Sequence, residues 1–177
     1  MSSINLKNIS CLDVDTDAIV NAANGNMIHG GGIARAIRLK AGKELDDACH
    51  IFPLPVEDGQ NIITPAFGIK NAKIIIHAVG PDFNKTPDAF DKLYDSYYNS
   101  LVSLKKMGFH KIAFPLISSG IFAGDINEPV KLSTRECIKS YNTFIKDNPN
   151  YEIEVILCAY TKEEYDEALD EFNNSVI

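Results

Sequence analysis

The sequence predicts an α/β fold in which a mostly parallel sheet lies between two layers of helices. Segments typical of strands alternate with segments typical of helices along the 177 residues, and several of the strand segments are apolar throughout. Strands of this kind are covered on both faces, as in the parallel sheets of α/β proteins. The chain shows no internal repeats, low-complexity tracts or linkers, so we expect residues 1–177 to form one domain.

Six segments are expected to be strands because they are rich in β-branched and other apolar residues. Residues 73–79 form a nearly continuous apolar run that ends at Gly80-Pro81, which indicates a strand covered on both faces. Pro65 favours an edge position for the strand that contains it, because proline cannot donate a hydrogen bond to a neighbouring strand. The six segments are residues 4–9, 17–22, 61–66, 73–79, 111–117 and 152–159.

Five segments carry apolar residues at helical spacing. Gly42 separates the first two, and Pro53 and Pro55 end the second. The third is expected to have Thr86 as its N-cap and Pro87 at its first position, where proline is well tolerated. The five segments are residues 33–41, 43–51, 88–106, 129–145 and 162–172.

Composition and charge exclude several classes of protein. The formal charge of −7 makes nucleic acid an unlikely partner, because such binding needs a basic surface. The sequence contains neither an apolar run of roughly 20 residues nor a secretory signal, so we expect no membrane association and a cytoplasmic protein. The four cysteines are widely scattered, and their spacing predicts reduced thiols with no metal site. We also expect a monomer without a cofactor.

The stretch from Asn21 to Ile37 passes from a buried strand, through polar and glycine residues, into an amphipathic helix. Gly30, Gly31 and Gly32 can bring backbone N–H groups close to a ligand, because no Cβ is in the way. They open a helix, whose N-terminus offers free N–H groups and the positive end of the dipole. This combination favours a phosphate site, whereas the glycines alone would also fit a flexible turn.

Polar residues also follow other strand ends. Residues 118–124 combine serine and glycine in a way that suits backbone binding of an anion, and Phe122 could lie against a ribose or base, or fill the core. Of Asn21 and Asn24, one could bind a sugar hydroxyl while the other braces the loop, or both could satisfy loop backbone. His29 adjoins the glycines and could be structural or catalytic.

Four segments, in this order and spacing, resemble the motifs of the macrodomain family. They are VNAAN at residues 20–24, the glycines at 30–32, HAVGP at 77–81 and AFPLISSGIF at 113–122. The resemblance extends from about residue 4 to residue 172. It implies a three-layer α/β/α fold with a mixed, mostly parallel sheet of about six strands, and ADP-ribose as the ligand.

The resemblance also implies a role for each matching residue. Asn24 would hold the distal ribose, the glycines and the serine-rich loop would bind the diphosphate, and Tyr160 would pack on adenine. Asn8 stands where the family often has an aspartate that reads the adenine amine, and it can still accept through its carbonyl oxygen. The implied ligand-binding set is Asn8, Ile9, Ala22, Asn24, Gly30, Gly31, Gly32, Ile33, Ser118, Ser119, Gly120, Ile121, Phe122 and Tyr160.

The expected activity is hydrolysis of mono-ADP-ribose from carboxylate side chains of modified proteins, with ADP-ribose and ADP-ribosylated proteins as partners. One catalytic branch of the family has an aspartate two residues after its glycines, and this chain has Ala34 there. It is similar instead to viral macrodomains, which lack that aspartate, and the resemblance implies Asn24, His29 and Phe122 as catalytic residues. Two alternatives stay open: a reader that binds ADP-ribose without cleaving it, and a deacetylase of O-acetyl-ADP-ribose.

Overall fold

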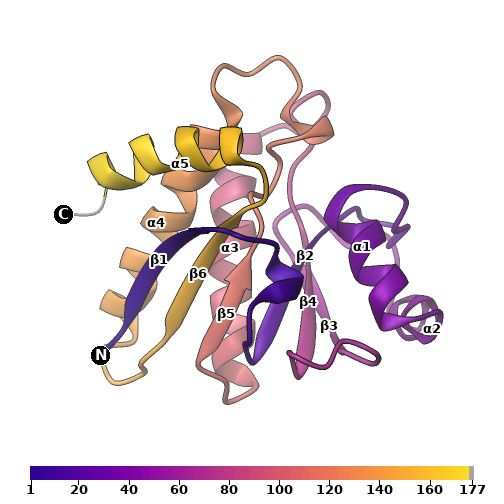
Figure 1. Ribbon diagram of the computed structural model, residues 1–177. Helices are drawn as coiled ribbons and strands as arrows, with labels where there is room; N and C mark the ends of the chain where they lie inside the picture. The colour runs from indigo at the N-terminus through magenta and orange to yellow at the C-terminus, as the bar shows by residue number, and fades with distance from the viewer. Residues whose placement is uncertain (176–177) are drawn as a thin grey trace.

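The computed structural model describes residues 1–175, and within them one six-stranded sheet runs through the molecule (Figure 1). The strand order is β1-β6-β5-β2-β4-β3. All neighbouring pairs are parallel except β3 and β4, which are antiparallel, so the sheet is mixed, and β3 with Pro65 lies at an edge as predicted. The strands are β1 (Ser3–Asn8), β2 (Ala18–Ala23), β3 (Asn61–Pro65), β4 (Ile74–Val79), β5 (Lys111–Phe114) and β6 (Glu154–Ala159).

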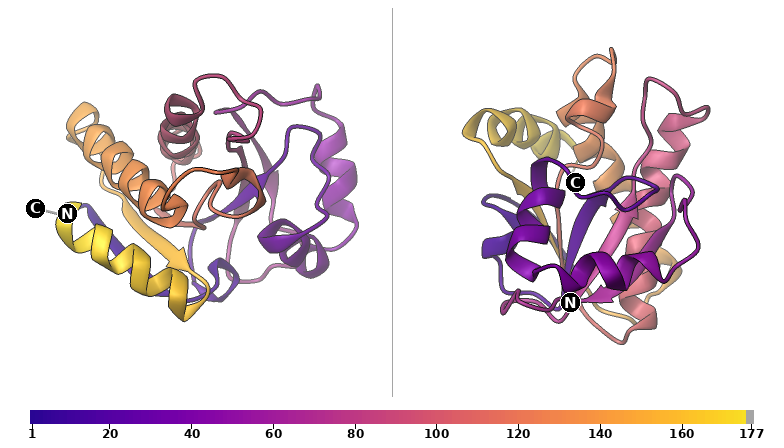
Figure 2. Two further views of the ribbon diagram at one scale, coloured as in Figure 1. Left: turned by 90° about the horizontal axis from the view of Figure 1, so that it is seen from above. Right: turned by 90° about the vertical axis from the view of Figure 1, so that its right-hand side faces the viewer.

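Helices cover both faces of this sheet and complete the expected three layers. The helices α3, α4 and α5 contribute buried residues to one core cluster, whereas α1 and α2 contribute to a second cluster on the opposite face. Figure 2 shows α1 and α2 on the other side of the strands from α3 and α4. The helices are α1 (Gly32–Ala41), α2 (Glu44–His50), α3 (Ala89–Lys106), α4 (Pro129–Asp147) and α5 (Lys162–Ser175), with short 3-10 turns η1 (Cys11–Asp13) and η2 (Ile121–Ala123).

Alternation along the central strands explains their apolar sequence. In β2, Ile19 belongs to the cluster under α1 and α2, and the next residue, Val20, belongs to the cluster under α3 and α4. In β4, Ile75 and Ile76 divide between the same two clusters. Both faces of these strands are therefore buried, as the continuous apolar run at residues 73–79 predicts.

Several element boundaries differ from the prediction by a few residues, and the differences at β5 and α3 are traced to particular residues. The strand expected at residues 111–117 ends at Phe114, because Pro115 has no N–H for the ladder. The helix expected from residue 88 begins at Ala89, and Thr86 does not cap it. The Thr86 hydroxyl instead donates to Asp58 Oδ2 (2.7 Å) and accepts from the backbone N–H of Asp82 (3.0 Å).

None of the helices within residues 1–175 combines the length and the apolar character needed to cross a membrane. The carboxyl ends of β1, β6, β5, β2 and β4 all lie at one edge of the sheet, because these strands are parallel. In open α/β sheets this edge is where ligands bind.

Candidate functional site

A cleft of about 900 Å³ lies at the carboxyl edge of the sheet. It is bounded by the loop from β2 to α1, by the loop that follows β5, and by the residues after β1 and β6. The predicted residues that line it are Ile9, Ala22, Asn24, Gly30, Gly31, Gly32, Ile33, Ser118, Ser119, Gly120, Ile121, Phe122 and Tyr160. The structure therefore brings together segments that are more than 130 residues apart in the sequence.

The N-terminus of α1 forms one wall of the cleft. Gly31 is the N-cap, and no side chain within the described residues caps this helix end, so its first N–H groups remain available. A Cβ on Gly30 or Gly31 would meet no described atom within 4 Å, so packing does not require glycine at these positions. Gly32 has a φ of +55°, which favours glycine. All three glycines are exposed and line the cleft, at a helix N-terminus of the kind that binds anions in other proteins.

The loop after β5 forms the opposite wall. Ser118 has a φ of +58°, and its hydroxyl donates to the carbonyl of Pro81 (2.7 Å). The hydroxyl of Ser119 donates to the carbonyl of Leu116 (2.8 Å). Both serine side chains thus fix the loop from within. Gly80 permits this turn, because a Cβ there would lie 2.6 Å from the Ser118 Oγ atom.

Asn24 braces the first loop and also lines the cleft. Its Nδ2 donates to the carbonyl of Ile28 (2.7 Å), and its Oδ1 accepts from the N–H of the same residue (3.0 Å). An asparagine amide has two N–H donors and two acceptor lone pairs. One donor and one acceptor position therefore remain for a ligand hydroxyl.

The end of the cleft at β1 and β6 is partly open. The Tyr160 side chain is 75% exposed and follows β6 directly, so a flat ligand group can pack against it. Asn8 lies outside the lining. Its Nδ2 donates to the carbonyls of Ala159 (2.9 Å) and Tyr160 (3.1 Å), which ties the ends of β1 and β6 together.

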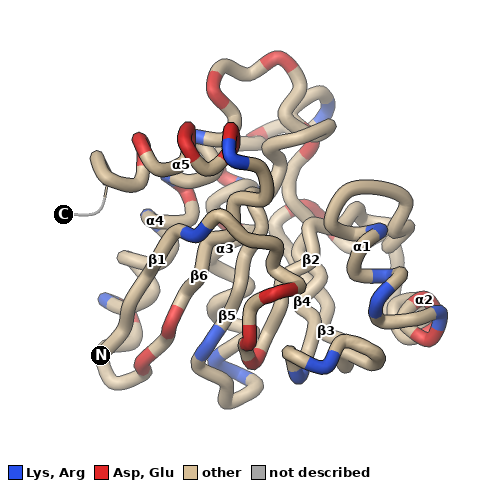
Figure 3. The backbone as a smooth tube through the Cα atoms, in the orientation of Figure 1, with Lys and Arg blue, Asp and Glu red and all other residues tan. Residues whose placement is uncertain are grey.

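Charged side chains around the cleft do not form a cationic patch. Lys40 lines it together with Asp13 and Glu164, so the lining carries more negative than positive charge. Figure 3 shows basic residues along α1 and acidic residues along α2 and α5. Backbone N–H groups, rather than cationic side chains, are therefore the donors that this lining offers to an anion.

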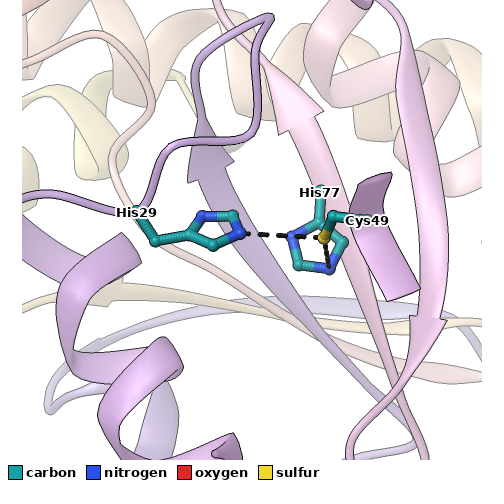
Figure 4. Close-up of side chains that lie close together, drawn as sticks. All are labelled: His29, Cys49 and His77. Carbon is teal, nitrogen blue, oxygen red and sulfur yellow. Dashed lines mark hydrogen bonds between the residues drawn. The ribbon is translucent and has the colours of Figure 1, made fainter. Parts of the chain in front are cut away.

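His29 lies outside the lining as well, since its ring turns away into the protein. Its Nδ1 lies 3.4 Å from Asn21 Nδ2, and its Nε2 lies 3.7 Å from Cys49 Sγ (Figure 4). Burial lowers the pKa of His29, and burial lowers the pKa of the neighbouring His77 to about 3. Burial also raises the pKa of the Cys49 thiol to about 11. All three side chains are therefore neutral at pH 7, and His77 is the hydrogen-bonded core residue that its buried strand suggests.

Several lining residues were not singled out from the sequence. Among them are Leu12 and Asp13 from η1 and Glu164 from the first turn of α5. Both segments follow carboxyl ends of strands, so the rule that ligands bind at this edge could have identified them. Ala34 also lines the cleft, within the first turn of α1.

Comparison with known proteins agrees with this fold. The sequence model of the family described as Macro domain matches residues 20–132. The chain belongs to the macrodomain family. The O-acetyl-ADP-ribose deacetylase of Cronobacter turicensis is 41% identical over 113 residues, which cover 62% of this macrodomain and 64% of that protein.

Solved structures of other macrodomains share the architecture. The Oceanobacillus iheyensis macrodomain with ADP superposes with a TM-score of 0.84 at 29% identity, covering 97% of this chain and 89% of that one. The Trypanosoma brucei macrodomain in complex with ADP-ribose gives a TM-score of 0.82 at 27% identity, covering 94% and 68%. The likeness thus extends over nearly the whole of this macrodomain.

Proposed function

We propose that this macrodomain binds ADP-ribose in the cleft and hydrolyses mono-ADP-ribose from carboxylate side chains of modified proteins. One observation carries the proposal: the uncapped N-terminus of α1 and the glycine- and serine-rich loop at residues 118–122 line opposite walls of the same cleft. Two sets of backbone donors on opposite walls suit a diphosphate, which has acceptor oxygens on both sides.

The two ends of the cleft suit the two remaining parts of ADP-ribose. The sheet order places the ends of β1 and β6 on one side of this diphosphate site, so Tyr160 and Ile9 would pack on the adenine. Asn24 follows β2, on the side of this site away from β1 and β6, and together with Phe122 it would bind the distal ribose. The amide of Asn24 keeps one donor and one acceptor for ribose hydroxyls while it braces the loop.

The reaction cleaves the ester that joins the distal ribose to the protein carboxylate. Water attacks the anomeric carbon of the distal ribose, and the bond between that carbon and the carboxylate oxygen breaks. Water thereby supplies the oxygen and hydrogen of the ribose hydroxyl, the side chain leaves as a carboxylate, and one proton is released. The first turn of α1 offers Ala34, which cannot act as a base. We therefore assign the positioning of the water to the substrate's own diphosphate, while Asn24 and Phe122 orient the sugar. His29 would support this loop from behind rather than contact the substrate.

A second candidate function uses the same cleft. The relative in Cronobacter turicensis is named for deacetylation of O-acetyl-ADP-ribose, which is also hydrolysis of an ester on a ribose hydroxyl. The non-enzymatic alternative is a domain that binds ADP-ribose without cleaving it. Ala34 favours this alternative, because α1 then has no catalytic carboxylate at that position.

Incubation with a mono-ADP-ribosylated, carboxylate-modified protein tests the proposal. We expect the wild type to release ADP-ribose, and we expect Asn24→Ala to be slower by a factor of about 100 or more. Asn26→Ala is the matched control, since Asn26 is exposed in the same loop and lies outside the cleft lining. Equal turnover by Asn24→Ala and wild type contradicts the mechanism. Retained label with tight ADP-ribose binding by calorimetry identifies a reader instead, and turnover of O-acetyl-ADP-ribose alone identifies a deacetylase.

A further inference from the structure

Three side chains of metal-ligating type meet behind the loop between β2 and α1. His29 in this loop, Cys49 on α2 and His77 on β4 each place one ligand atom within 4.8 Å of the other two. The Nε2 atoms of His29 and His77 lie 3.7 Å and 3.8 Å from the Cys49 sulfur (Figure 4). With Zn–N bonds of about 2.05 Å and a Zn–S bond of about 2.3 Å, a tetrahedral ion separates nitrogen and sulfur by about 3.6 Å. Both nitrogen–sulfur distances are therefore close to those of a tetrahedral metal site.

Asn21 provides a second, independent observation. It pairs with His77 across β2 and β4, and its side chain is fully buried. Its Nδ2 lies 3.0 Å from His77 Nδ1 and 3.4 Å from His29 Nδ1, which are the ring nitrogens that face away from Cys49. Its Oδ1 has no hydrogen-bond partner within the part of the chain that the structure describes. A buried amide thus approaches both rings while its acceptor is unused.

A bound metal would make use of that acceptor. A histidine that binds a metal through Nε2 carries its proton on Nδ1 and donates it to a nearby acceptor, which fixes the ring. A half-turn of the Asn21 amide exchanges Nδ2 for Oδ1, and Oδ1 then accepts from both Nδ1–H groups. Asn21 would therefore orient the two rings without contacting the ion.

We propose that His29, Cys49 and His77 bind one divalent transition-metal ion of the zinc class through the two Nε2 atoms and the sulfur. Imidazole and thiolate ligands suit this class, whereas magnesium and calcium prefer oxygen. Binding releases the thiol proton of Cys49 to solvent, and the histidines bind as neutral ligands, so the ion and thiolate together carry one net positive charge. Three protein ligands leave a fourth tetrahedral position.

Metal binding would require His77 to give up a hydrogen bond to the Thr64 hydroxyl. This hydroxyl lies 2.9 Å from His77 Nε2 and donates to the carbonyl of Pro65, so it accepts the Nε2–H of the histidine. On metal binding, the His77 proton resides on Nδ1 instead, and Nε2 exchanges this hydrogen bond for the ion. Thr64 or a water molecule is then available for the fourth position.

The proposed site connects the ligand-binding loop to the core. His29 immediately precedes Gly30, whereas Cys49 on α2 and His77 on β4 are fully buried. A metal bound to all three fixes the loop that carries the cleft glycines and places a positive charge next to it. We therefore expect the metal to tighten ADP-ribose binding. This last consequence rests on the proposed function, whereas the metal site itself does not.

Titration of the tag-free protein with Co²⁺ under reducing, anaerobic conditions tests the site without ADP-ribose. After treatment with a chelator, we expect the wild type to bind one equivalent with a thiolate-to-cobalt charge-transfer band and the visible bands of a tetrahedral ion. We expect Zn²⁺ to displace the cobalt and abolish both features. A wild type that shows no saturable thiolate band overturns the proposal, whatever the variants do.

Two cysteine variants identify the sulfur. Cys49→Ala is expected to lose the charge-transfer band, whereas Cys137→Ala, which removes a buried cysteine from α4 in the other core cluster, is expected to keep it. Far-UV circular dichroism serves as the control that each variant is folded. A band that survives Cys49→Ala overturns the assignment. Asn21→Ala is expected to weaken Zn²⁺ binding, measured against a chromogenic chelator, by about 10- to 100-fold. An unchanged affinity removes the orienting role from Asn21.

Discussion

Substitution of Gly31 is expected to separate the stability of α1 from the anion binding that we propose for its N-terminus. The backbone of Gly31 is extended (φ −158°, ψ 172°), and a Cβ there would meet no described atom within 4 Å. Aspartate and asparagine both fit this geometry and are preferred N-cap residues. We therefore expect Gly31→Asp and Gly31→Asn to be at least as stable as the wild type, with a gain of a few tenths of a kcal/mol.

ADP-ribose binding is expected to fall in both variants, but to different degrees. The asparagine side chain takes one helix N–H from the ligand, and losing one hydrogen bond to a charged group costs about 1.5–3 kcal/mol, or roughly 10- to 150-fold in Kd. The aspartate adds a negative charge near the diphosphate. Two like charges about 4 Å apart repel by about 4 kcal/mol at an effective dielectric constant of 20, which is a further factor of roughly 1000.

Calorimetry with ADP-ribose, combined with thermal unfolding, measures both quantities. The Gly31→Asn variant is the matched control, because it has nearly the same shape as Gly31→Asp without the charge. A folded Gly31→Asp variant that binds ADP-ribose within about tenfold of the wild type would refute the assignment of the diphosphate to the N-terminus of α1.

Three further predictions concern stability. Gly80→Ala should destabilise the fold by about 1–3 kcal/mol, because its Cβ would collide with the side chains of Ile117 and Ser118; an unchanged Tm contradicts this. Tyr97→Phe should cost about 1–3 kcal/mol in urea unfolding, because the buried N–H of Ile117 loses its acceptor. Burial raises the pKa of Asp17, but hydrogen bonds from two backbone N–H groups and a lysine outweigh it and lower the pKa overall. Asp17 therefore stabilises the fold at pH values above its pKa in the unfolded state, which is about 3.9. This stabilisation is lost as the pH falls through the lower pKa of Asp17 in the folded state. The destabilisation by Asp17→Asn at neutral pH should accordingly shrink in acid.

Much of the fold follows from local patterns in the sequence. The apolar run at residues 73–79 predicts β4 because a strand buried on both faces has little room for polar side chains. The three glycines before a helical pattern predict the cleft wall, since backbone donors at a helix N-terminus need no particular side chain. Features of this kind depend on residues that are close together in the sequence, so they can be predicted from one sequence without knowledge of tertiary contacts.

Features that depend on tertiary contacts were missed. The start of α3 is displaced because the Thr86 hydroxyl has partners outside the helix, at Asp58 and Asp82. The contact of Cys49 with two histidines arises only when the loop after β2, α2 and β4 pack together. Its members are too far apart in sequence to show the spacing of a metal motif.

The net negative charge of the molecule, set against the proposed binding of a diphosphate in the cleft, has a consequence for the kinetics of binding. The formal charge of −7 repels an approaching diphosphate at long range, whereas the amides of α1 attract it only at contact. Salt screens the first interaction strongly, since the Debye length is about 8 Å at physiological ionic strength, and it affects buried hydrogen bonds much less. The association rate should therefore increase as salt is added, with little change in dissociation. Proteins that capture phosphates with a basic patch show the opposite dependence, so stopped-flow measurements at several ionic strengths would distinguish the two modes of recognition.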